Sequence, residues 1–424
     1  MKLNLIKESS VYITSNIIVT AIPLLFLPLL TRFLEPEEYN AIAMFQSLML
    51  TCGALLGFSV NGFCNIKYFE VKEDLAEFSF YVTNAIFVLF VSTVFAISIS
   101  ILASFTEVVI WGLTPRDYLL IPLAFFCQYI VYIRLGVYQV TKKSLKYGGV
   151  SFALAAINMS TTAILVIYLE SGYFGRIAGI VFSLACISCF CLVSLYKEKL
   201  IVRKLNILNL KEITRYGLTY LPIIFASTFI PLTERIIITS ELGADSGGLF
   251  IVATQVSNGL LLIISSIAVA YTPYVYKRLS NTDRIDLAKK IFTYEILAVV
   301  LLTVFSLVIL YSGIPKAVLS YILPENYYDA IDLSVYLIFS VVGKTGFVIW
   351  SIYLVFWKKN TILSLFNIFV GAVNLILIYF FIQKYGIGYI GYLSIFFKFT
   401  SSVFIAGLVF LFLCRIDFRS NSKC

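Results

Sequence analysis

An all-α integral membrane protein is the fold class that the sequence predicts, and three observations predict it. The 424-residue chain is 60% hydrophobic and only 13% charged, whereas soluble domains are about one quarter charged. Apolar runs of about 20 residues, long enough to cross hydrocarbon as a helix, recur along the whole chain. The strict alternation of a membrane β-barrel is absent, so we expect the spans to be helices.

Twelve apolar runs are expected to span the membrane. The first follows Lys2 and Lys7, as a signal sequence would, but it is long and ends without a small-residue cleavage site, so we interpret it as a retained span. The runs lie near 11–33, 40–64, 79–104, 118–140, 150–169, 177–196, 218–240, 249–275, 293–313, 334–357, 361–382 and 390–413.

Lysine and arginine set the expected orientation. If the N-terminus is cytoplasmic, most of the 32 basic residues fall in segments on the inner side, as the positive-inside rule requires. Both termini are then predicted to lie in the cytoplasm. The net charge of +9 is explained by this topology and by attraction to anionic lipid head groups. Nucleic-acid binding is excluded, because no solvated basic face is predicted.

Cysteine and histidine usage argues against a metal site or an enzyme. The chain has eight cysteines and no histidine. Cys186 and Cys189 have the C-x-x-C spacing of a zinc site, but zinc takes four ligands, so small apolar helix residues are the better interpretation. No cofactor, no metal and no catalytic residue is predicted. The missing histidine also rules out histidine bases and triads.

The two halves of the chain echo each other. "PLLTR" ends at Arg32 and "PLTER" ends at Arg235, and Lys142-Lys143 is matched by Lys358-Lys359. Because these pairs recur in the same order about half a chain apart, we expect two parallel repeats. The predicted organisation is a six-helix lobe over 1–196, a cytoplasmic amphipathic linker over 197–217 and a second six-helix lobe over 218–424.

Charged residues inside the predicted spans are the candidate functional residues, because each costs about 2.5–3.5 kcal/mol at a helix centre by insertion scales. Their cations outnumber their carboxylates, which indicates an interior that receives an anion. Arg32 and Arg235 lie near the outer surface, where the alternative is snorkelling to the head groups; for the other cations it is a structural ion pair. The candidates for substrate binding are Arg32, Arg134, Arg235, Lys344 and Lys398. Those for coupling or charge balance are Glu234 and Glu295.

Three stretches resemble one family of membrane proteins. "RYGLTYLPIIFASTFIPLTERIIITSELGADSGGLFIVATQVSN" is similar to the seventh-span signature of Wzx-type polysaccharide flippases, in the superfamily of multidrug (MATE) exporters. "LPLLTRFLEPEEYNAIAMFQSL" resembles the first two spans of that family, and "YGIGYIGYLS" its last loop and helix. The matching positions are Tyr216, Gly217, Pro222, Glu234, Arg235 and Gly248. Glu234 replaces the more usual aspartate, and Glu35 and Asn40 stand where glycine is common.

The resemblance implies a MATE-like fold of two six-helix lobes around a cationic central cavity. It implies translocation of undecaprenyl-diphosphate-linked oligosaccharide repeat units, for O-antigen or capsular polysaccharide, across the bacterial inner membrane by alternating access. Arg235 and Arg32 would then help to bind the diphosphate, and Glu234 would balance that charge or relay a proton. The implied partners are the lipid-linked oligosaccharide, the lipid bilayer, and the polysaccharide polymerase and chain-length proteins.

Three other functions remain open at the level of sequence. A drug or ion exporter of the same fold would favour a cavity lined by carboxylates, whereas buried cations are in excess here. A membrane glycan polymerase or ligase usually carries a large outer loop, and the outer loops here are short. A channel would need a filter, and the sequence offers no obvious one.

Overall fold

The computed structural model describes residues 24–71, 74–105, 111–279 and 285–421. Within these ranges the regular secondary structure is helical throughout. The chain divides into two compact units, Met1–Thr239 and Ser240–Cys424.

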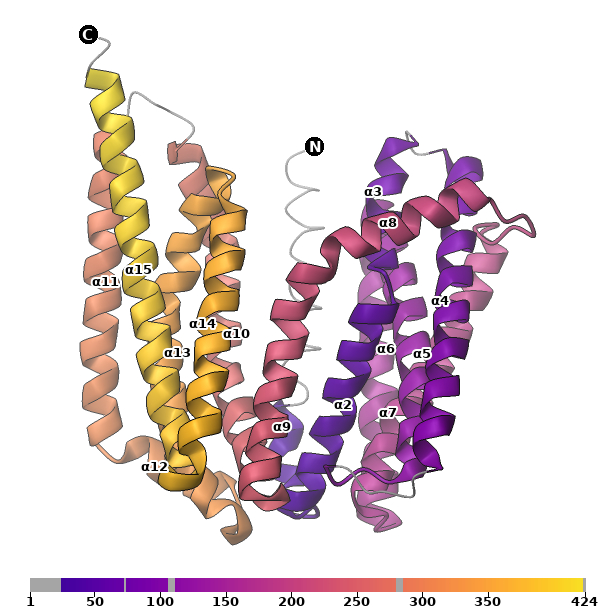
Figure 1. The fold of residues 1–424 in the computed structure, drawn as a ribbon, viewed down its shortest axis with the longest axis horizontal. Coiled ribbons are helices and arrows are strands. Elements are labelled where there is room, and N and C mark those ends of the chain that lie inside the picture. The colour runs from indigo at the N-terminus through magenta and orange to yellow at the C-terminus, as the bar shows by residue number, and fades with distance from the viewer. Residues whose placement is uncertain (1–23, 72–73, 106–110, 280–284, 422–424) are drawn as a thin grey trace. The chain divides into compact units, whose positions relative to one another are not determined.

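The first unit contains the helices up to α9 (Figure 1). They are α2 (Pro36–Leu56), α3 (Val60–Glu70), α4 (Leu75–Ser104), α5 (Pro115–Val140), α6 (Ser144–Ala163), the π-helix η1 (Ile164–Tyr168), α7 (Gly172–Lys197), α8 (Ile207–Ile224), the π-helix η2 (Phe225–Phe229) and α9 (Ile230–Leu242), whose last three residues belong to the second unit.

The second unit is built on α13, which packs against both α10 and α15, and its core includes Phe292, Trp350 and Tyr353. Its helices are α10 (Ala244–Leu279), α11 (Ile285–Tyr311), α12 (Ile314–Ile322), the 3₁₀ turn η4 (Glu325–Tyr327), α13 (Tyr328–Phe356), α14 (Asn360–Tyr385) and α15 (Gly388–Asn421).

Ten helices of the described residues are long and apolar enough to cross a membrane, and they coincide with ten of the twelve predicted runs. Of the other two, 11–33 lies largely outside the described residues. The run 218–240 is helical as the end of α8, η2 and α9. The all-α membrane fold class is therefore confirmed, and the protein is a multi-pass membrane protein.

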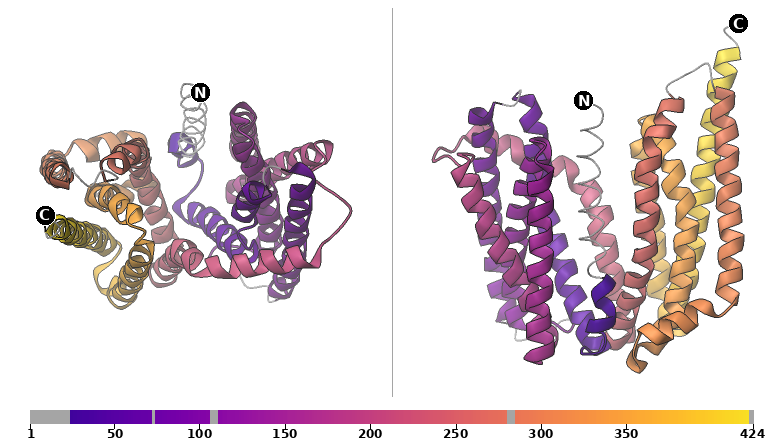
Figure 2. Two further views of the ribbon diagram at one scale, coloured as in Figure 1. Left: turned by 90° about the horizontal axis from the view of Figure 1, so that it is seen from above. Right: turned by 180° about the vertical axis from the view of Figure 1, so that it is seen from behind.

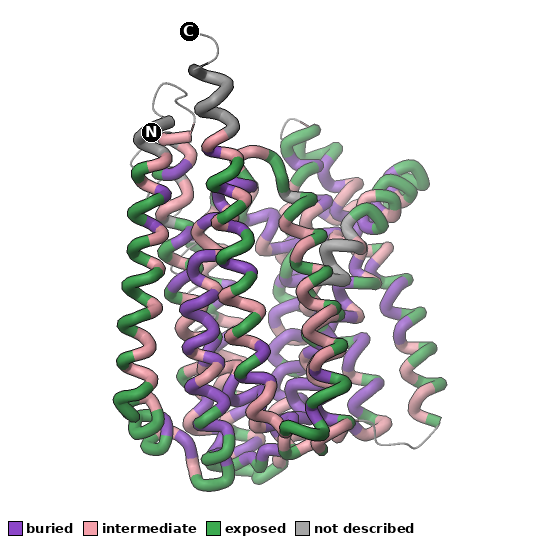
Figure 3. The backbone as a smooth tube through the Cα atoms, turned by 60° about the vertical axis from the view of Figure 1, so that its left-hand side comes forward, coloured by how far each residue is buried: buried purple, intermediate pink, exposed green. Residues whose placement is uncertain are grey.

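Burial differs sharply between helices, as the tube in Figure 3 shows by colour. In the most apolar window of α5, 67% of residues are buried, against 28% in α4 and in the α6–η1 span. In the second unit the same share is 61% for α13 and 6% for α11. The buried helices form the core of each unit, and the apolar exposed faces of the others suit lipid.

The predicted second span is not one straight helix. It breaks after α2 at Gly57, where Phe58 and Ser59 have φ values of 48°, in the left-handed region. Gly57 lies so close to the Tyr129 ring of α5 that a Cβ atom would overlap it. Close packing against α5 therefore leaves no room for a side chain at the point where the helix ends, and hydropathy does not mark this point.

The predicted linker is partly helical. Residues 200–206 are not helical, and α8 begins at Ile207, where Ile207 and Leu208 are exposed. Figures 1 and 2 show α8 crossing the ends of α3 and α4 before the chain turns into α9 beside α2. By contacts α8 and α9 group with the first unit. The division into two six-helix lobes, 1–196 and 218–424, stays a prediction.

Candidate functional site

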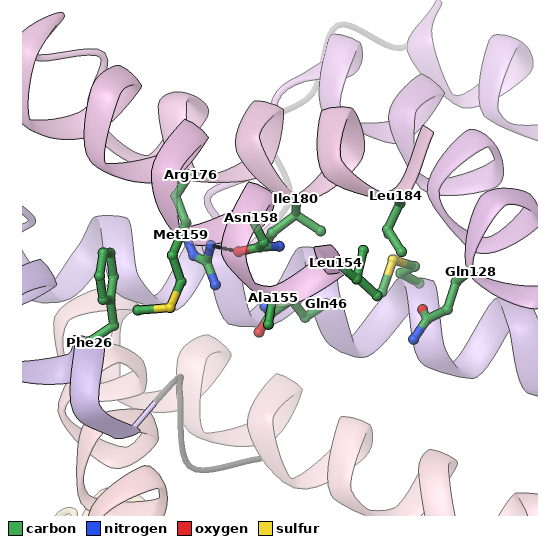
Figure 4. A pocket seen from close by; sticks show the side chains of 11 residues that line it. Phe26, Gln46, Gln128, Leu154, Ala155, Asn158, Met159, Arg176, Ile180 and Leu184 are labelled. Carbon is green, nitrogen blue, oxygen red and sulfur yellow. Dashed lines mark hydrogen bonds between the residues drawn. The ribbon is translucent and has the colours of Figure 1, made fainter. Parts of the chain in front are cut away.

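A cavity with a mostly apolar wall and a few polar groups lies in the first unit, among α2, α5, α6 and α7 (Figure 4). Its volume is about 220 Å³. Four side chains that can form hydrogen bonds face it, one from each helix, and the rest of the lining is apolar apart from the methionine thioethers. The lining residues are Phe26, Gln46, Met49, Gln128, Leu154, Ala155, Asn158, Met159, Arg176, Ile180 and Leu184.

Arg176 of α7 supplies the positive charge of this cavity. Its Nη1 atom donates to Asn158 Oδ1 at 2.5 Å and to Thr162 Oγ1 at 2.6 Å, both on α6. Asn158 in turn donates from Nδ2 to Ser183 Oγ at 3.1 Å. Among the described residues Arg176 forms no ion pair with a carboxylate. The guanidinium of Arg176 in the cavity wall is therefore fixed by hydrogen bonds to neutral groups, and its charge is not neutralised by a direct ion pair.

Small residues bring α6 and α7 close enough for this contact. A Cβ atom at Gly179 would lie 2.8 Å from Thr162 Oγ1, and Thr161 Oγ1 donates to the Gly179 carbonyl oxygen at 3.3 Å. Asn158 and Thr162 are four residues apart, so they occupy one face of α6. That face meets Arg176 because glycine lets the two helices approach.

Arg235 of α9 lies against α2 in the same unit. Its Nη1 atom donates to Ser47 Oγ and, at 3.4 Å, to the Ala43 carbonyl oxygen. One turn later Thr239 Oγ1 donates to Asn40 Oδ1 at 3.0 Å. Because Gln46 faces the cavity while Ser47 binds Arg235, α2 contributes to both arginine sites. Glu234 is half-buried beside Arg235 and adds to its electrostatic surroundings.

Arg134 is fully buried on α5 and has a carboxylate partner. Nη2 lies 2.8 Å from Glu198 Oε1 and Nη1 lies 3.2 Å from Oε2, while Nη2 also donates to Ser194 Oγ at 2.6 Å. The guanidinium lies over the Tyr138 ring, 4.1 Å from its centroid. Partial burial acts to raise the pKa of the Glu198 carboxyl, but the hydrogen bond and charge of Arg134, joined by Lys143, outweigh it and lower that pKa.

Arg32 is exposed, in a turn just after the helical residues 24–30. It therefore lies at the end of the first helix rather than within it. Its predicted role in binding the diphosphate stays a prediction.

Lys344 and Lys398 belong to the second unit. Lys398 of α15 donates from Nζ to Ser340 Oγ of α13 at 2.8 Å. Ser340 and Lys344 are one turn apart on α13, so they share a helix face. Lys344 is half-buried and makes no hydrogen bond or ion pair within the described part of the chain. α13 and α15 lie close together at Gly343, since a Cβ atom there would meet the Phe399 ring.

Glu295 of α11 is a buried carboxylate in the second unit, 8% exposed. Its Oε1 atom accepts hydrogen bonds from Tyr271 at 2.6 Å and from Tyr353 at 2.8 Å. Its Oε2 atom is buried and makes no hydrogen bond of normal geometry in the described structure; the indole N–H of Trp350, which also lacks one, is the donor nearby. No group of three metal-ligating side chains occurs among the described residues.

The candidates from the sequence are thus distributed over several places. Arg235 lies against α2, Arg134 pairs with Glu198, and Lys344 and Lys398 flank Ser340 in the other unit. Sequence reasoning missed the cavity residues Arg176, Asn158, Gln46 and Gln128. It placed Arg176 in an outer loop because the apolar run begins at residue 177, whereas α7 begins at Gly172.

Comparison with known proteins identifies the family. The model of the polysaccharide biosynthesis protein family matches residues 5–278, more than half of the chain. The chain belongs to this family. Among similar proteins is Lsg locus protein 1 of Haemophilus influenzae, 22% identical over 364 residues, which are 84% of this chain and 86% of that protein. A membrane protein of the same organism is 23% identical over 285 residues, 66% of this chain and 67% of the relative.

Solved structures establish the fold. An inward-facing multidrug resistance MATE transporter of the MOP superfamily has a TM-score of 0.72 at 12% identity, covering 94% of this chain and 95% of its own. The outward-facing conformation of a MATE transporter has a TM-score of 0.59 at 13% identity, with 97% and 96% covered. This member of the polysaccharide biosynthesis family therefore has the MATE transporter fold, and the predicted relationship is confirmed.

Proposed function

We propose that this protein is a flippase that translocates undecaprenyl-diphosphate-linked oligosaccharide repeat units across the bacterial inner membrane by alternating access. The observation that carries the proposal is Arg176, a cation on a membrane-spanning helix that is held by an amide and a hydroxyl rather than by a carboxylate. Family membership links the chain to polysaccharide biosynthesis, and the MATE fold is a transporter fold. No covalent step is part of this function.

The chemistry of the cavity suits a phosphate with attached sugar. A guanidinium offers several N–H donors in a planar fork that matches phosphate oxygens. Because a charge within a membrane is costly, such residues commonly mark a path for substrate or ions. The amides of Gln46, Gln128 and Asn158 can exchange hydrogen bonds with sugar hydroxyls. Carboxylates, which a cation exporter would need, are absent from the lining of this cavity.

The size of the cavity limits what it can hold. Small-molecule pockets usually measure roughly 300–1,000 Å³, and this one measures about 220 Å³. It is large enough for a phosphate group or one sugar ring, and too small for a repeat unit. We therefore propose that it binds one part of the head group, and that Arg32, Arg134, Arg235, Lys344 and Lys398 remain candidates for contacts elsewhere along the path.

Coupling is proposed to involve Glu295, with Glu234 balancing the charge of Arg235. Glu295 is held by two phenols, and one of its oxygens is buried and makes no hydrogen bond of normal geometry in the described structure. A carboxylate in that setting can bind a proton on its free oxygen and release it when the surroundings open to water.

The orientation is part of the proposal. The positive-inside rule favours cytoplasmic termini. Reporter fusions test it: a C-terminal green fluorescent protein should fluoresce and a C-terminal alkaline phosphatase should be inactive. The reverse pattern would overturn the proposed orientation. A polysaccharide polymerase and chain-length proteins are the expected downstream partners.

The test of function is deletion and complementation in the organism that carries the gene. Without the protein, lipid-linked repeat units should accumulate on the inner leaflet and surface polysaccharide should fall. The wild-type gene and Arg176→Lys should restore polysaccharide at least in part, whereas Arg176→Gln should not, at equal protein abundance. Arg116→Gln is the matched control, because Arg116 is exposed on α5 and stacks on Phe174.

Two results would reject the proposal. One is undiminished polymerised glycan in the deletion strain. The other is loss of resistance to organic cations with no change in glycan, which would indicate a drug exporter of the same fold.

A further inference from the structure

The first unit has a second hollow, which does not share a lining residue with the cavity that contains Arg176. It is a groove of about 590 Å³ between α6 and α7, with Tyr138 of α5 at one end. Its walls include Gly149, Ala153 and Ile157 of α6 and Cys186 and Phe190 of α7. The polar residues that line it, Tyr138, Lys146 and Ser194, belong to the end of the unit where α6 begins and α7 finishes.

The length of the groove matches one leaflet of a bilayer. Its lining on α6 runs from Lys146 to Ile157, which at the helical rise corresponds to roughly 16 Å. The hydrocarbon core of a bilayer is about 30 Å thick, so the groove extends over about half of it. This is the depth that an acyl chain of one leaflet occupies, with its head group beside Lys146.

The charge at that end is positive beyond what the protein neutralises. Glu198 is the carboxylate shared by three cations: Arg134 at 2.8 Å, Lys143 at 3.4 Å and Lys146 at 3.7 Å. This group of four residues therefore has two positive charges in excess. The side chain of Lys146 is 58% exposed and that of Lys143 is 40% exposed, so both can reach a phosphate at the membrane surface.

The start of α6 adds donors at the same place. Lys143 is its N-cap residue and makes no side-chain capping bond. The first N–H groups of a helix have no partner within the helix and attract anions. A phosphate near Lys146 would meet these groups together with the lysines.

We propose that this groove, defined by Lys146, Gly149, Ala153, Ile157, Cys186 and Phe190, is a binding site for an anionic phospholipid of the bilayer. One acyl chain lies between α6 and α7, and the phosphate lies between Lys146, Lys143 and the N-terminus of α6. The site does not depend on the flippase proposal, because its phosphate contacts are Lys143 and Lys146, which are not among the residues proposed to bind substrate. The isoprenoid substrate itself is the competing occupant, and the experiment separates the two.

The groove can be tested by replacing a glycine of its wall with a larger residue. A Cβ atom at Gly149 would have no heavy atom within 4 Å, so Gly149→Leu should fold and occupy the space of the acyl chain. Gly407 of α15 is likewise exposed in a helix with open space at its Cβ position, and Gly407→Leu is the matched control. Lys146→Gln removes the charge, and Lys211→Gln removes an exposed lysine of α8 in the same unit.

The measurement is native mass spectrometry of the full-length protein with phosphatidylglycerol, phosphatidylcholine or undecaprenyl diphosphate added. Wild type should bind phosphatidylglycerol at least fivefold more tightly than phosphatidylcholine, and Lys146→Gln should lower that preference by roughly fivefold, the value of one lysine near an anionic surface. Gly149→Leu should weaken both lipids, and the two control variants should behave as wild type.

Three results would overturn the assignment. Equal binding of the two phospholipids would mean that the basic end does not select a head group. Unchanged binding by Gly149→Leu would place the lipid elsewhere. Displacement of phosphatidylglycerol from the wild type by undecaprenyl diphosphate, together with weaker binding of undecaprenyl diphosphate to Gly149→Leu, would make the groove a site for the substrate carrier.

Discussion

Replacing Glu198 with glutamine should destabilise the first unit, because it leaves Arg134 buried without its counter-charge. Arg134 is 0% exposed and is bound through both terminal nitrogens to the Glu198 carboxylate. Breaking a fully buried ion pair costs about 3–5 kcal/mol. Glu198 itself is 30% exposed, and glutamine keeps one oxygen acceptor, so we expect about 2 kcal/mol. The contacts to Lys143 and Lys146 are exposed and add little.

The assay is thermal unfolding of the purified protein in detergent, where Glu198→Gln should lower the melting temperature by roughly 5 °C. The effect should depend on pH. Because the folded state lowers the pKa of Glu198, its contribution is complete above the unfolded-state pKa and is lost as pH falls through the folded-state pKa. The two proteins should therefore differ fully above roughly pH 5 and converge in more acidic buffer.

Glu170→Gln is the control for this experiment, because Glu170 is exposed and forms no ion pair in the described structure. It should melt as wild type does. If Glu198→Gln also melted as wild type at neutral pH, Arg134 would not depend on Glu198, and the account of this ion pair would be wrong.

Two further predictions concern helix packing. Thr239→Val should lower the free energy of unfolding by about 1–3 kcal/mol, because it removes the donor to the fully buried Asn40 side chain. Thermal unfolding checks this against Thr233→Val, which removes an exposed hydrogen bond to the Phe229 carbonyl oxygen. Equal losses of stability in the two variants would contradict the prediction. Gly343→Ala should cost about 1–3 kcal/mol by pushing the Phe399 ring away, whereas Gly407→Ala should be neutral or stabilising; a stable Gly343→Ala protein would show that α13 and α15 are not tightly apposed.

Composition and hydropathy were sufficient to predict the helices, because lipid permits few other spanning structures. Ten predicted runs coincide with ten membrane-length helices of the described residues. What hydropathy could not show is where a helix breaks or begins when polar or small residues occur there. The helix ends at Gly57, which packs against Tyr129 of another helix, and the start of α7 contains Gly172, Gly175 and Arg176, none of which adds hydropathy.

The candidate site was harder to predict, because its residues are brought together by contacts between helices that hydropathy does not show. The partner of Arg134 lies 64 residues away in sequence, and only tertiary packing brings Glu198 to it. Arg176 meets Asn158 because Gly179 lets α7 approach α6. An arginine between two nearby glycines, Gly175 and Gly179, at the start of an apolar run is the signal that could have indicated Arg176. Choosing candidates only within apolar runs misses polar residues at the start of a helix, before the run begins.

The central claim is that Arg176 binds an anionic group of the substrate, and the affinity of the purified protein for a lipid-linked diphosphate oligosaccharide tests it most directly. Hydrogen bonds to charged groups are worth about 1.5–3 kcal/mol, so Arg176→Gln should bind roughly tenfold more weakly or worse. Arg116→Gln should bind as wild type does. Equal affinity of Arg176→Gln and wild type, with both proteins folded, would contradict the claim.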